Sequence, residues 1–141
     1  VAVTGVQTCA LPISQRYFEA WARVTPDEGL RALLRLVAVR EGEHALTFEK
    51  RILELGYTLR PRPSDEAEEK LRRLSDPSVS DAQKLDFLGY GAGQPPASDI
   101  FEDFFRDHSI DIETGALLGR YIAEERDTVR RLREARQRLR G

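Results

Sequence analysis

The sequence of 141 residues contains no methionine, one cysteine and one tryptophan, and neither sign of charge is in clear excess. One cysteine can form neither an intramolecular disulfide nor a four-cysteine metal site, so the core must be held together by packing. No apolar run approaches the roughly 18 residues of a membrane-spanning helix. A formal net charge of −2 argues against nucleic acid as the main partner. The composition, 40% apolar and 33% charged, predicts one soluble, cytoplasmic domain.

The N-terminal segment does not resemble the rest of the chain. Residues 3–13, VTGVQTCALPI, read as a sequencing-library adapter translated in frame. A signal peptide is a weaker interpretation because the segment lacks a basic start and carries Thr4, Gln7 and Thr8 where an apolar stretch is needed; an apolar strand is left open. We expect residues 1–14 to be adapter-derived and irregular in part, and residues 15–141 to form the domain of a metagenomic fragment whose natural start is lost.

Apolar residues at spacings of three and four predict a long helix from about residue 26 to Gly56. Thr25, Pro26 and Glu28 resemble a capping box with Thr25 as the N-cap, and Gly56 is a typical stop. The inward stripe of this helix comprises Leu30, Leu33, Leu34, Val37, Ala38, Ala45, Phe48, Ile52 and Leu55. A helix ending at Val24 precedes it, and the short turn at Thr25 makes the two antiparallel.

Shorter helices are expected in the middle of the chain, at about 64–74 and 80–88. Pro61 and Pro63 exclude helix from the segment that precedes residue 64. The run of glycine and proline at 89–96 ends the helix expected at 80–88. A helix restarts at Ser98, and residues 110–139 form the last long one. The pattern predicts an all-α fold, an antiparallel bundle with a short or broken third helix and no sheet.

Glu41 and His44 are the residues that carry chemistry in this pattern. They share the inward stripe, four residues from Val37 and Phe48 respectively. Buried ionisable groups need a metal ion, an opposing charge or a hydrogen-bond network. A carboxylate and an imidazole one turn apart can hold one metal ion, but arginines at the edge of the stripe can satisfy them equally, and both interpretations stay open. A weak repeat of 83 residues places Glu124 at the position equivalent to Glu41.

These features resemble a known family. The stretch from Tyr17-Phe18 through Glu41-x-x-His44-Ala45 to Phe48 is similar to the first half of a rubrerythrin-type, ferritin-like domain. Such domains are four-helix bundles in which two helices each supply a Glu and two others each supply an ExxH, together holding two iron or manganese ions. The resemblance covers about residues 15–56 and, through the repeat, faintly 98–140.

The resemblance implies an incomplete metal site. The metal ligands that the resemblance implies are Glu41, His44, Glu124 and Asp127. Asp127 stands where the family motif has a histidine, and it can instead pair with Arg130 or Arg131. The first-helix Glu falls near Thr8 in the adapter segment. The third-helix Glu falls near Gly91, where the nearest carboxylate is Asp86. We expect at most one weakly held iron or manganese ion.

Two function classes remain open from the sequence. One is a di-metal oxidoreductase that reduces peroxide or oxygen in the full-length parent. The other is a metal-free helical module for interaction or oligomerisation, in which self-association would use helix faces. The arginines of the last helix fit its dipole and are balanced by acids elsewhere, so nucleic acid is not expected as a partner.

Overall fold

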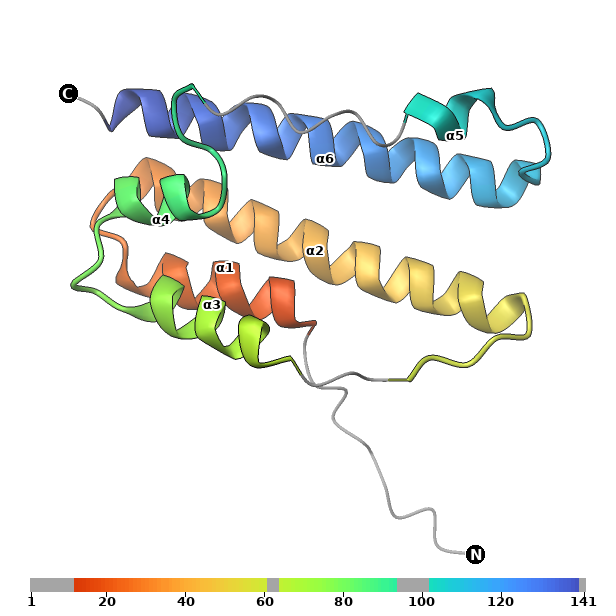
Figure 1. Cartoon of the computed structure of the whole chain (residues 1–141), viewed down its shortest axis with the longest axis horizontal. Coiled ribbons are helices and arrows are strands. Elements are labelled where there is room, and N and C mark those ends of the chain that lie inside the picture. The colour runs from red at the N-terminus through yellow and green to blue at the C-terminus, as the bar shows by residue number, and fades with distance from the viewer. Residues whose placement is uncertain (1–11, 61–63, 94–101, 140–141) are drawn as a thin grey trace, which may run out of the picture.

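The computed structural model describes residues 12–60, 64–93 and 102–139, and every regular element in them is a helix (Figure 1). The helices are α1 (Ile13–Val24), α2 (Glu28–Glu54), α3 (Asp65–Ser75), α4 (Asp81–Phe87), α5 (Glu102–Arg106) and α6 (Ile112–Arg138). The all-α prediction is therefore confirmed for the described residues. Within those residues, no helix has the length and apolar character that crossing a membrane requires.

Two long helices, α2 and α6, lie side by side and antiparallel along the molecule (Figure 1). Helix α1 packs antiparallel on the first half of α2, and α3 lies beside α1. Helix α4 contacts α6 near its C-terminal end. The predicted pairing of the two long helices is confirmed, and the helices described between them in the sequence, α3, α4 and α5, are short. A ferritin-like four-helix bundle is not established by this arrangement.

The core lies at one end of the molecule, where α1, α3, α4, the start of α2 and the end of α6 meet. Among the described residues, seven apolar side chains there are completely buried: Trp21, Leu30, Leu34, Val37, Leu74, Leu85 and Leu132. Burying this much apolar surface is the main stabilising contribution to such a fold. The core also encloses Asp81, which accepts hydrogen bonds from Trp21 Nε1 at 2.7 Å and Thr25 Oγ1 at 2.6 Å. A carboxylate from α4 therefore joins α4 to the turn between α1 and α2.

The start of α2 differs from the prediction. The N-cap is Asp27, whose carboxylate accepts from the backbone N–H of Leu30 at 2.6 Å. Thr25 instead ends α1, and its hydroxyl is used by Asp81. The capping-box interpretation of Thr25 was therefore wrong, because two polar residues compete at this turn and the buried carboxylate takes the hydroxyl.

The other predicted helix boundaries agree with the structure. Gly56 adopts a φ of 85°, and the backbone N–H groups of Gly56 and Tyr57 donate to Leu53 and Ile52, which closes α2 with a Schellman motif. Ser64 caps α3, and Ser80 caps α4 with a full capping box. Helix α1 begins at Ile13, one turn before Tyr17. The predictions for residues 1–11, for Pro61 and Pro63, and for 94–101 lie outside the described residues.

Candidate metal centre

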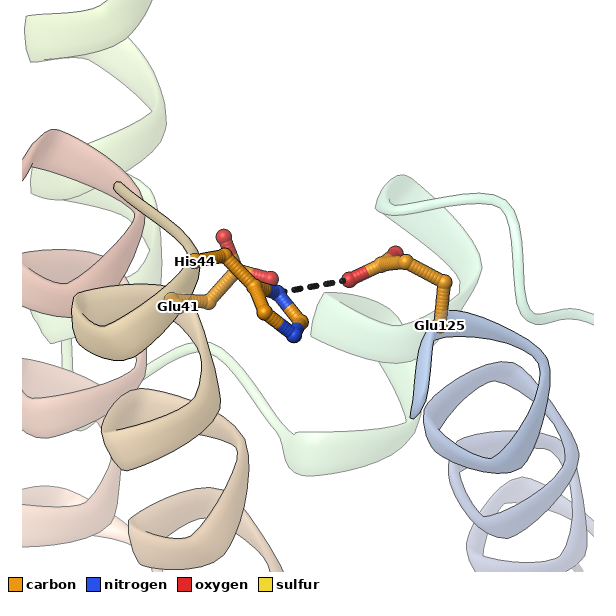
Figure 2. Close-up of side chains that lie close together, drawn as sticks. All are labelled: Glu41, His44 and Glu125. Carbon is orange, nitrogen blue, oxygen red and sulfur yellow. Dashed lines mark ion pairs between the residues drawn. The ribbon is translucent and has the colours of Figure 1, made fainter. Parts of the chain in front are cut away.

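Three potential metal ligands meet between the two long helices. Glu41 and His44 lie one turn apart on α2, and Glu125 faces them from α6 (Figure 2). One ligand atom from each residue lies within 4.8 Å of the other two. Helix α1 begins close by, since a Cβ on Gly42 would lie only 2.5 Å from Gln15 Oε1. The group therefore lies where the well-packed end of the molecule gives way to the pair of α2 and α6, and it could hold a metal ion.

His44 is held in place by Glu124. The side chain of His44 is only 12% exposed, and its Nε2 lies 2.6 Å from Glu124 Oε2. Burial raises the pKa of Glu124, but hydrogen bonds from His44 and Arg120 outweigh it and leave this pKa below its usual range. An ionised carboxylate has no proton to donate, so Nε2 carries the proton and donates it. Glu124 thereby fixes both the ring orientation and the side on which the imidazole is protonated.

The other ring nitrogen, Nδ1 of His44, has no hydrogen-bond partner although it is buried. It lies 3.6 Å from Glu125 Oε1, beyond normal hydrogen-bonding distance (Figure 2). In a neutral ring with the proton on Nε2, this nitrogen presents a lone pair to the two carboxylates. Three groups that can each offer a lone pair to a cation thus converge, and together they could hold a metal ion.

The protonation of Glu125 reflects this crowding. Burial and the nearby charge of Glu41 raise the pKa of Glu125 from 4.5 to about 6, and a hydrogen bond shared with Glu41 contributes in the same direction. A carboxylate this close to another one ionises less readily than it would alone. A metal ion bound beside Glu125 would favour its ionised form.

Aromatic side chains line the group. The ring of Tyr121 meets His44 edge-on with 4.8 Å between the ring centres, and it meets Phe48 at 5.1 Å. Burial raises the pKa of Tyr121, and that of Tyr90 to about 12, with Glu125 and Glu41 adding to both effects. Both phenols therefore stay protonated at neutral pH. The ring of Tyr121 covers one edge of the imidazole.

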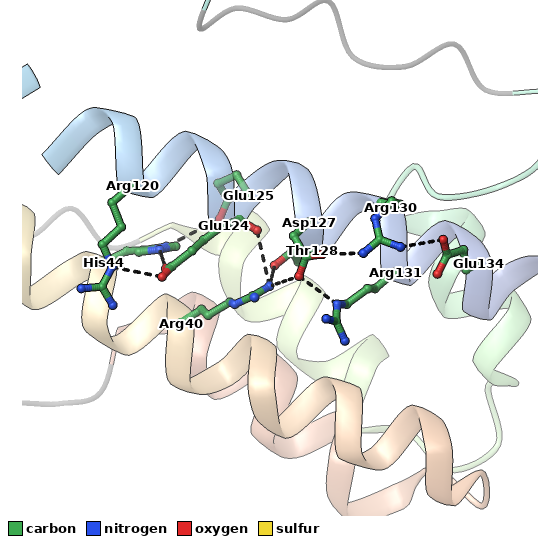
Figure 3. Close-up of polar contacts among 10 residues, drawn as sticks. All are labelled: Arg40, His44, Arg120, Glu124, Glu125, Asp127, Thr128, Arg130, Arg131 and Glu134. Atoms are coloured by element: carbon green, nitrogen blue, oxygen red, sulfur yellow. Dashed lines mark hydrogen bonds and ion pairs between the residues drawn. The ribbon is translucent and has the colours of Figure 1, made fainter. Parts of the chain in front are cut away.

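A second polar cluster lies one turn further along the same interface (Figure 3). Arg40 of α2 donates to Asp127 Oδ2 at 2.9 Å and to Thr128 Oγ1 at 3.0 Å. Arg130 and Arg131 also donate to Asp127, and these hydrogen bonds hold its pKa at about 2. Asp127 is therefore a permanently ionised partner of three arginines.

The structure brings together some of the predicted site residues and separates others. Glu41 and His44 lie together facing α6, and Glu124 is within reach of His44, as expected. Asp127 pairs with Arg130 and Arg131, as the alternative for that residue predicts, and also with Arg40. That Glu124 and Asp127 serve as metal ligands stays a prediction, although both are engaged elsewhere.

The remaining expected positions of the family pattern contribute nothing to the group. Asp86, the carboxylate nearest to the third-helix position, forms a two-pronged ion pair with Arg136 at 2.7 and 2.8 Å. The first-helix position near Thr8 lies outside the described residues.

Sequence reasoning missed Glu125. The 83-residue repeat aligned Glu41 with Glu124 and so drew attention to the neighbouring residue. A signal for Glu125 was present, because it lies four residues after Tyr121 and four before Val129, both on the apolar stripe of α6. Helical spacing within α6 was thus a better guide than the internal repeat.

The group fits one ion better than two. Nitrogen and oxygen ligands lie about 2.0–2.2 Å from a transition metal, so two donors on one ion are at most about 4.4 Å apart. The observed 4.8 Å needs only small side-chain rotations to reach this separation. A second ion would need Glu124 or Asp127, and these carboxylates are held by His44 and Arg120 and by three arginines respectively.

Comparison with protein-family models, curated proteins and solved structures gives no match to this chain. The resemblance to rubrerythrin-type domains accordingly has no support from these comparisons. What stands is an all-helical domain with a Glu, His and Glu group between two antiparallel helices.

Proposed function

We propose that this protein binds one divalent metal ion between α2 and α6, with Glu41, His44 and Glu125 as ligands. One observation carries the proposal: the buried Nδ1 of His44 faces two carboxylates and has no hydrogen-bond partner. A mixed oxygen and nitrogen ligand set favours manganese, iron, cobalt or zinc over calcium or magnesium, which prefer oxygen alone.

The surrounding residues have defined roles in this proposal. Glu124 holds the Nε2 proton of His44, so that Nδ1 is the atom directed at the ion; such outer partners fix the orientation and basicity of histidine ligands. Glu125, whose pKa burial and the charge of Glu41 raise to about 6, would bind the ion in its ionised form. Tyr121 packs against the edge of His44 and limits the movement of the ring.

The proposal extends to a ferritin-like domain with oxidoreductase chemistry. Iron or manganese at such a site supplies one-electron chemistry toward peroxide or oxygen, while the protein supplies binding, orientation and protons. The residues support a single ion and not the two-ion centre of a rubrerythrin-type enzyme, because Asp127 is neutralised by arginines. The support for the family is the spacing of Glu41, His44 and the aromatic residues before them.

A metal-free interaction module is the second candidate. The observation in its favour is that α2 and α6 are already joined without a metal, by the pair of His44 and Glu124 and by Arg40 with Asp127. In that case a second proton on His44 would face Glu125 and satisfy both groups. The domain would then function through its surface.

Metal titration separates the two candidates. The chain is freed of metal with a chelator and dialysed against Mn²⁺, Co²⁺ or Zn²⁺ in separate experiments, and the bound metal is counted. We expect about one equivalent per chain, and no binding at this site in His44→Ala or Glu125→Gln, because each removes a ligand. Two equivalents would contradict the single-ion geometry.

Two variants serve as controls. Asp127→Asn removes a neighbouring carboxylate that the proposal leaves out of the site, and it should keep the full equivalent. Glu124→Gln should keep the stoichiometry but weaken the affinity by about 10- to 100-fold, the usual effect of removing an outer partner. If the unaltered chain binds none of the three metals, the interaction module is the better explanation.

A further inference from the structure

The outer face of α2 carries a regular apolar stripe that no described element covers. It consists of Leu36, Val39, Leu46 and Leu53. Two charged residues flank it: Lys50, and Glu43, which contacts Arg120 of α6. Val39, Leu46 and Leu53 recur every seven residues and are 57%, 63% and 54% exposed. Single exposed apolar residues are ordinary, but a stripe about 26 Å long on one helix face is a typical interaction surface.

The stripe is complementary to itself when it runs in the opposite direction. Val39 lies seven residues before Leu46, and Leu53 lies seven residues after it. Glu43 and Lys50, of opposite charge, lie three residues before and four residues after Leu46. A two-fold axis beside Leu46 would therefore place Leu46 against its own copy and Val39 against Leu53.

The charges select the direction of pairing. In an antiparallel pair, Glu43 of each copy lies on the same side of the contact as Lys50 of the other and can pair with it. In a parallel pair, the two residues would lie on opposite sides of the contact, and no such pair would form. Both side chains extend into solvent, with 57% and 78% exposed. Their contacts within the chain are loose, at 3.6 Å to Arg120 and to Glu54 respectively. Such flanking charges set the orientation and the partner of paired helices.

We propose that two copies of this chain form an antiparallel, two-fold symmetric dimer through the α2 stripe. The proposal does not use the metal ligands, which lie on another face of α2; Glu43 is linked to them only through Arg120, which also donates to Glu124. The surface area that a stripe on one helix can bury lies at the lower end of the range for specific protein interfaces. The dimer should therefore form reversibly at micromolar concentrations.

Sedimentation equilibrium over a range of protein concentrations tests the dimer. We expect the unaltered chain to dimerise and Leu46→Glu to stay monomeric with an unchanged circular dichroism spectrum, because the position is exposed in the monomer. A chain that stays monomeric up to high micromolar concentration would overturn the proposal and leave the stripe to a different partner. A dimer that persists in Leu46→Glu would overturn this face as its interface.

Charge reversal tests the direction. Glu43→Lys alone and Lys50→Glu alone should each weaken dimerisation by about tenfold, the effect of turning a favourable pair into a repulsive one at two symmetric places. The double variant Glu43→Lys with Lys50→Glu should recover the unaltered affinity, although the contacts with Arg120 and Glu54 are not restored. Failure of the double variant to recover would overturn the antiparallel register.

Disulfide trapping provides a second test that does not depend on charge. In a background with Cys9→Ser, Leu46→Cys should form a dimer-linking disulfide under mild oxidation, because the two copies of this position face each other. Leu53→Cys, which would face Val39, is the matched control and should link poorly. Equal linking at the two positions, or none at Leu46, would contradict the proposed axis.

Discussion

The two ends of the α2 and α6 pair are stabilised in different ways. At one end, α1, α3 and α4 cover the helices, and Leu30, Leu34 and Leu132 are completely buried. At the other end, Arg51 donates to Thr114 at 2.9 Å and pairs with Asp111 at 2.9 Å and Glu113 at 3.2 Å, and the ring of Phe48 packs on that of Tyr121. Two helices of equal length can thus be joined mainly by apolar packing at one end and with a larger share of polar contacts at the other.

The metal group lies at the junction of these two regions. Glu41 and Glu125 lie close together, burial raises the pKa of Glu125, and Nδ1 of His44, which faces Glu125, has no hydrogen-bond partner. Neither region explains them: they add no apolar packing, and their charges repel. A site of this kind reduces the stability of the metal-free protein and gains stability when a cation binds.

The largest difference is expected from one substitution made in both regions. Leu34→Ala removes a completely buried side chain, and it should lower the free energy of unfolding by about 3 kcal/mol. Leu55→Ala, at the other end of the same helix and 50% exposed, should cost less than about 1 kcal/mol. Urea denaturation followed by circular dichroism measures both. Equal costs would show that the apolar core extends along the whole of α2.

The polar contacts of the two regions should also differ in strength. Asp81→Ala leaves the buried donors of Trp21 and Thr25 without their acceptor, and it should cost about 2–3 kcal/mol. Arg51→Met removes ion pairs whose acidic partners are exposed, and it should cost about 1 kcal/mol or less. Chemical denaturation gives both values. Fluorescence of the single tryptophan, Trp21, should change in Asp81→Ala and stay unchanged in Arg51→Met.

Much of this fold was predictable because each helix carries its own local signals. The stripe from Leu30 to Leu55 and the stop at Gly56 define α2, and the serines at 64 and 80 define α3 and α4. The start of α2 was misplaced because Thr25 is used by Asp81, which lies 56 residues further along the chain. Local spacing contains no information about such a partner.

The candidate site was predictable only in part. Glu41 and His44 follow from the period of one helix, and their inward position is a local property. The identity of the facing residue depends on the rotation of α6 against α2, which side-chain packing along the whole interface determines. Glu124 and Glu125 are neighbours on α6, yet Glu124 holds His44 and Glu125 joins the metal group. A small difference in the rotation of α6 about its own axis therefore decides which residue takes which role.

The smallest expected effect concerns pH and the metal group. In metal-free protein, the raised pKa of Glu125 means that its favourable contribution is fully present below about pH 4.5 and is lost as the pH rises through about 6. The rise from 4.5 to about 6 corresponds to about 2 kcal/mol at most. Glu125→Gln should therefore gain stability over the unaltered chain between pH 4.5 and 7.

Thermal or urea denaturation with a chelator present measures this difference at each pH. Acids with lowered pKa values, such as Asp127, act in the opposite direction at lower pH, but they are common to both proteins and cancel in the comparison. Glu49→Gln, on an exposed part of α2, is the control and should show no such pH dependence. A constant difference between Glu125→Gln and the unaltered chain would mean that Glu125 is hydrated as surface acids are.

The most direct test of the metal centre is nuclear magnetic resonance of the histidine side chains in ¹⁵N-labelled protein during a titration with Zn²⁺. The chain has two histidines, His44 and His108, so both imidazoles can be followed. We predict that Nδ1 of His44 shifts to the value of a metal-bound nitrogen, that its Nε2 stays protonated against Glu124, and that His108 does not change. Binding through Nε2 of His44, or a metal shift at His108 alone, would contradict the account.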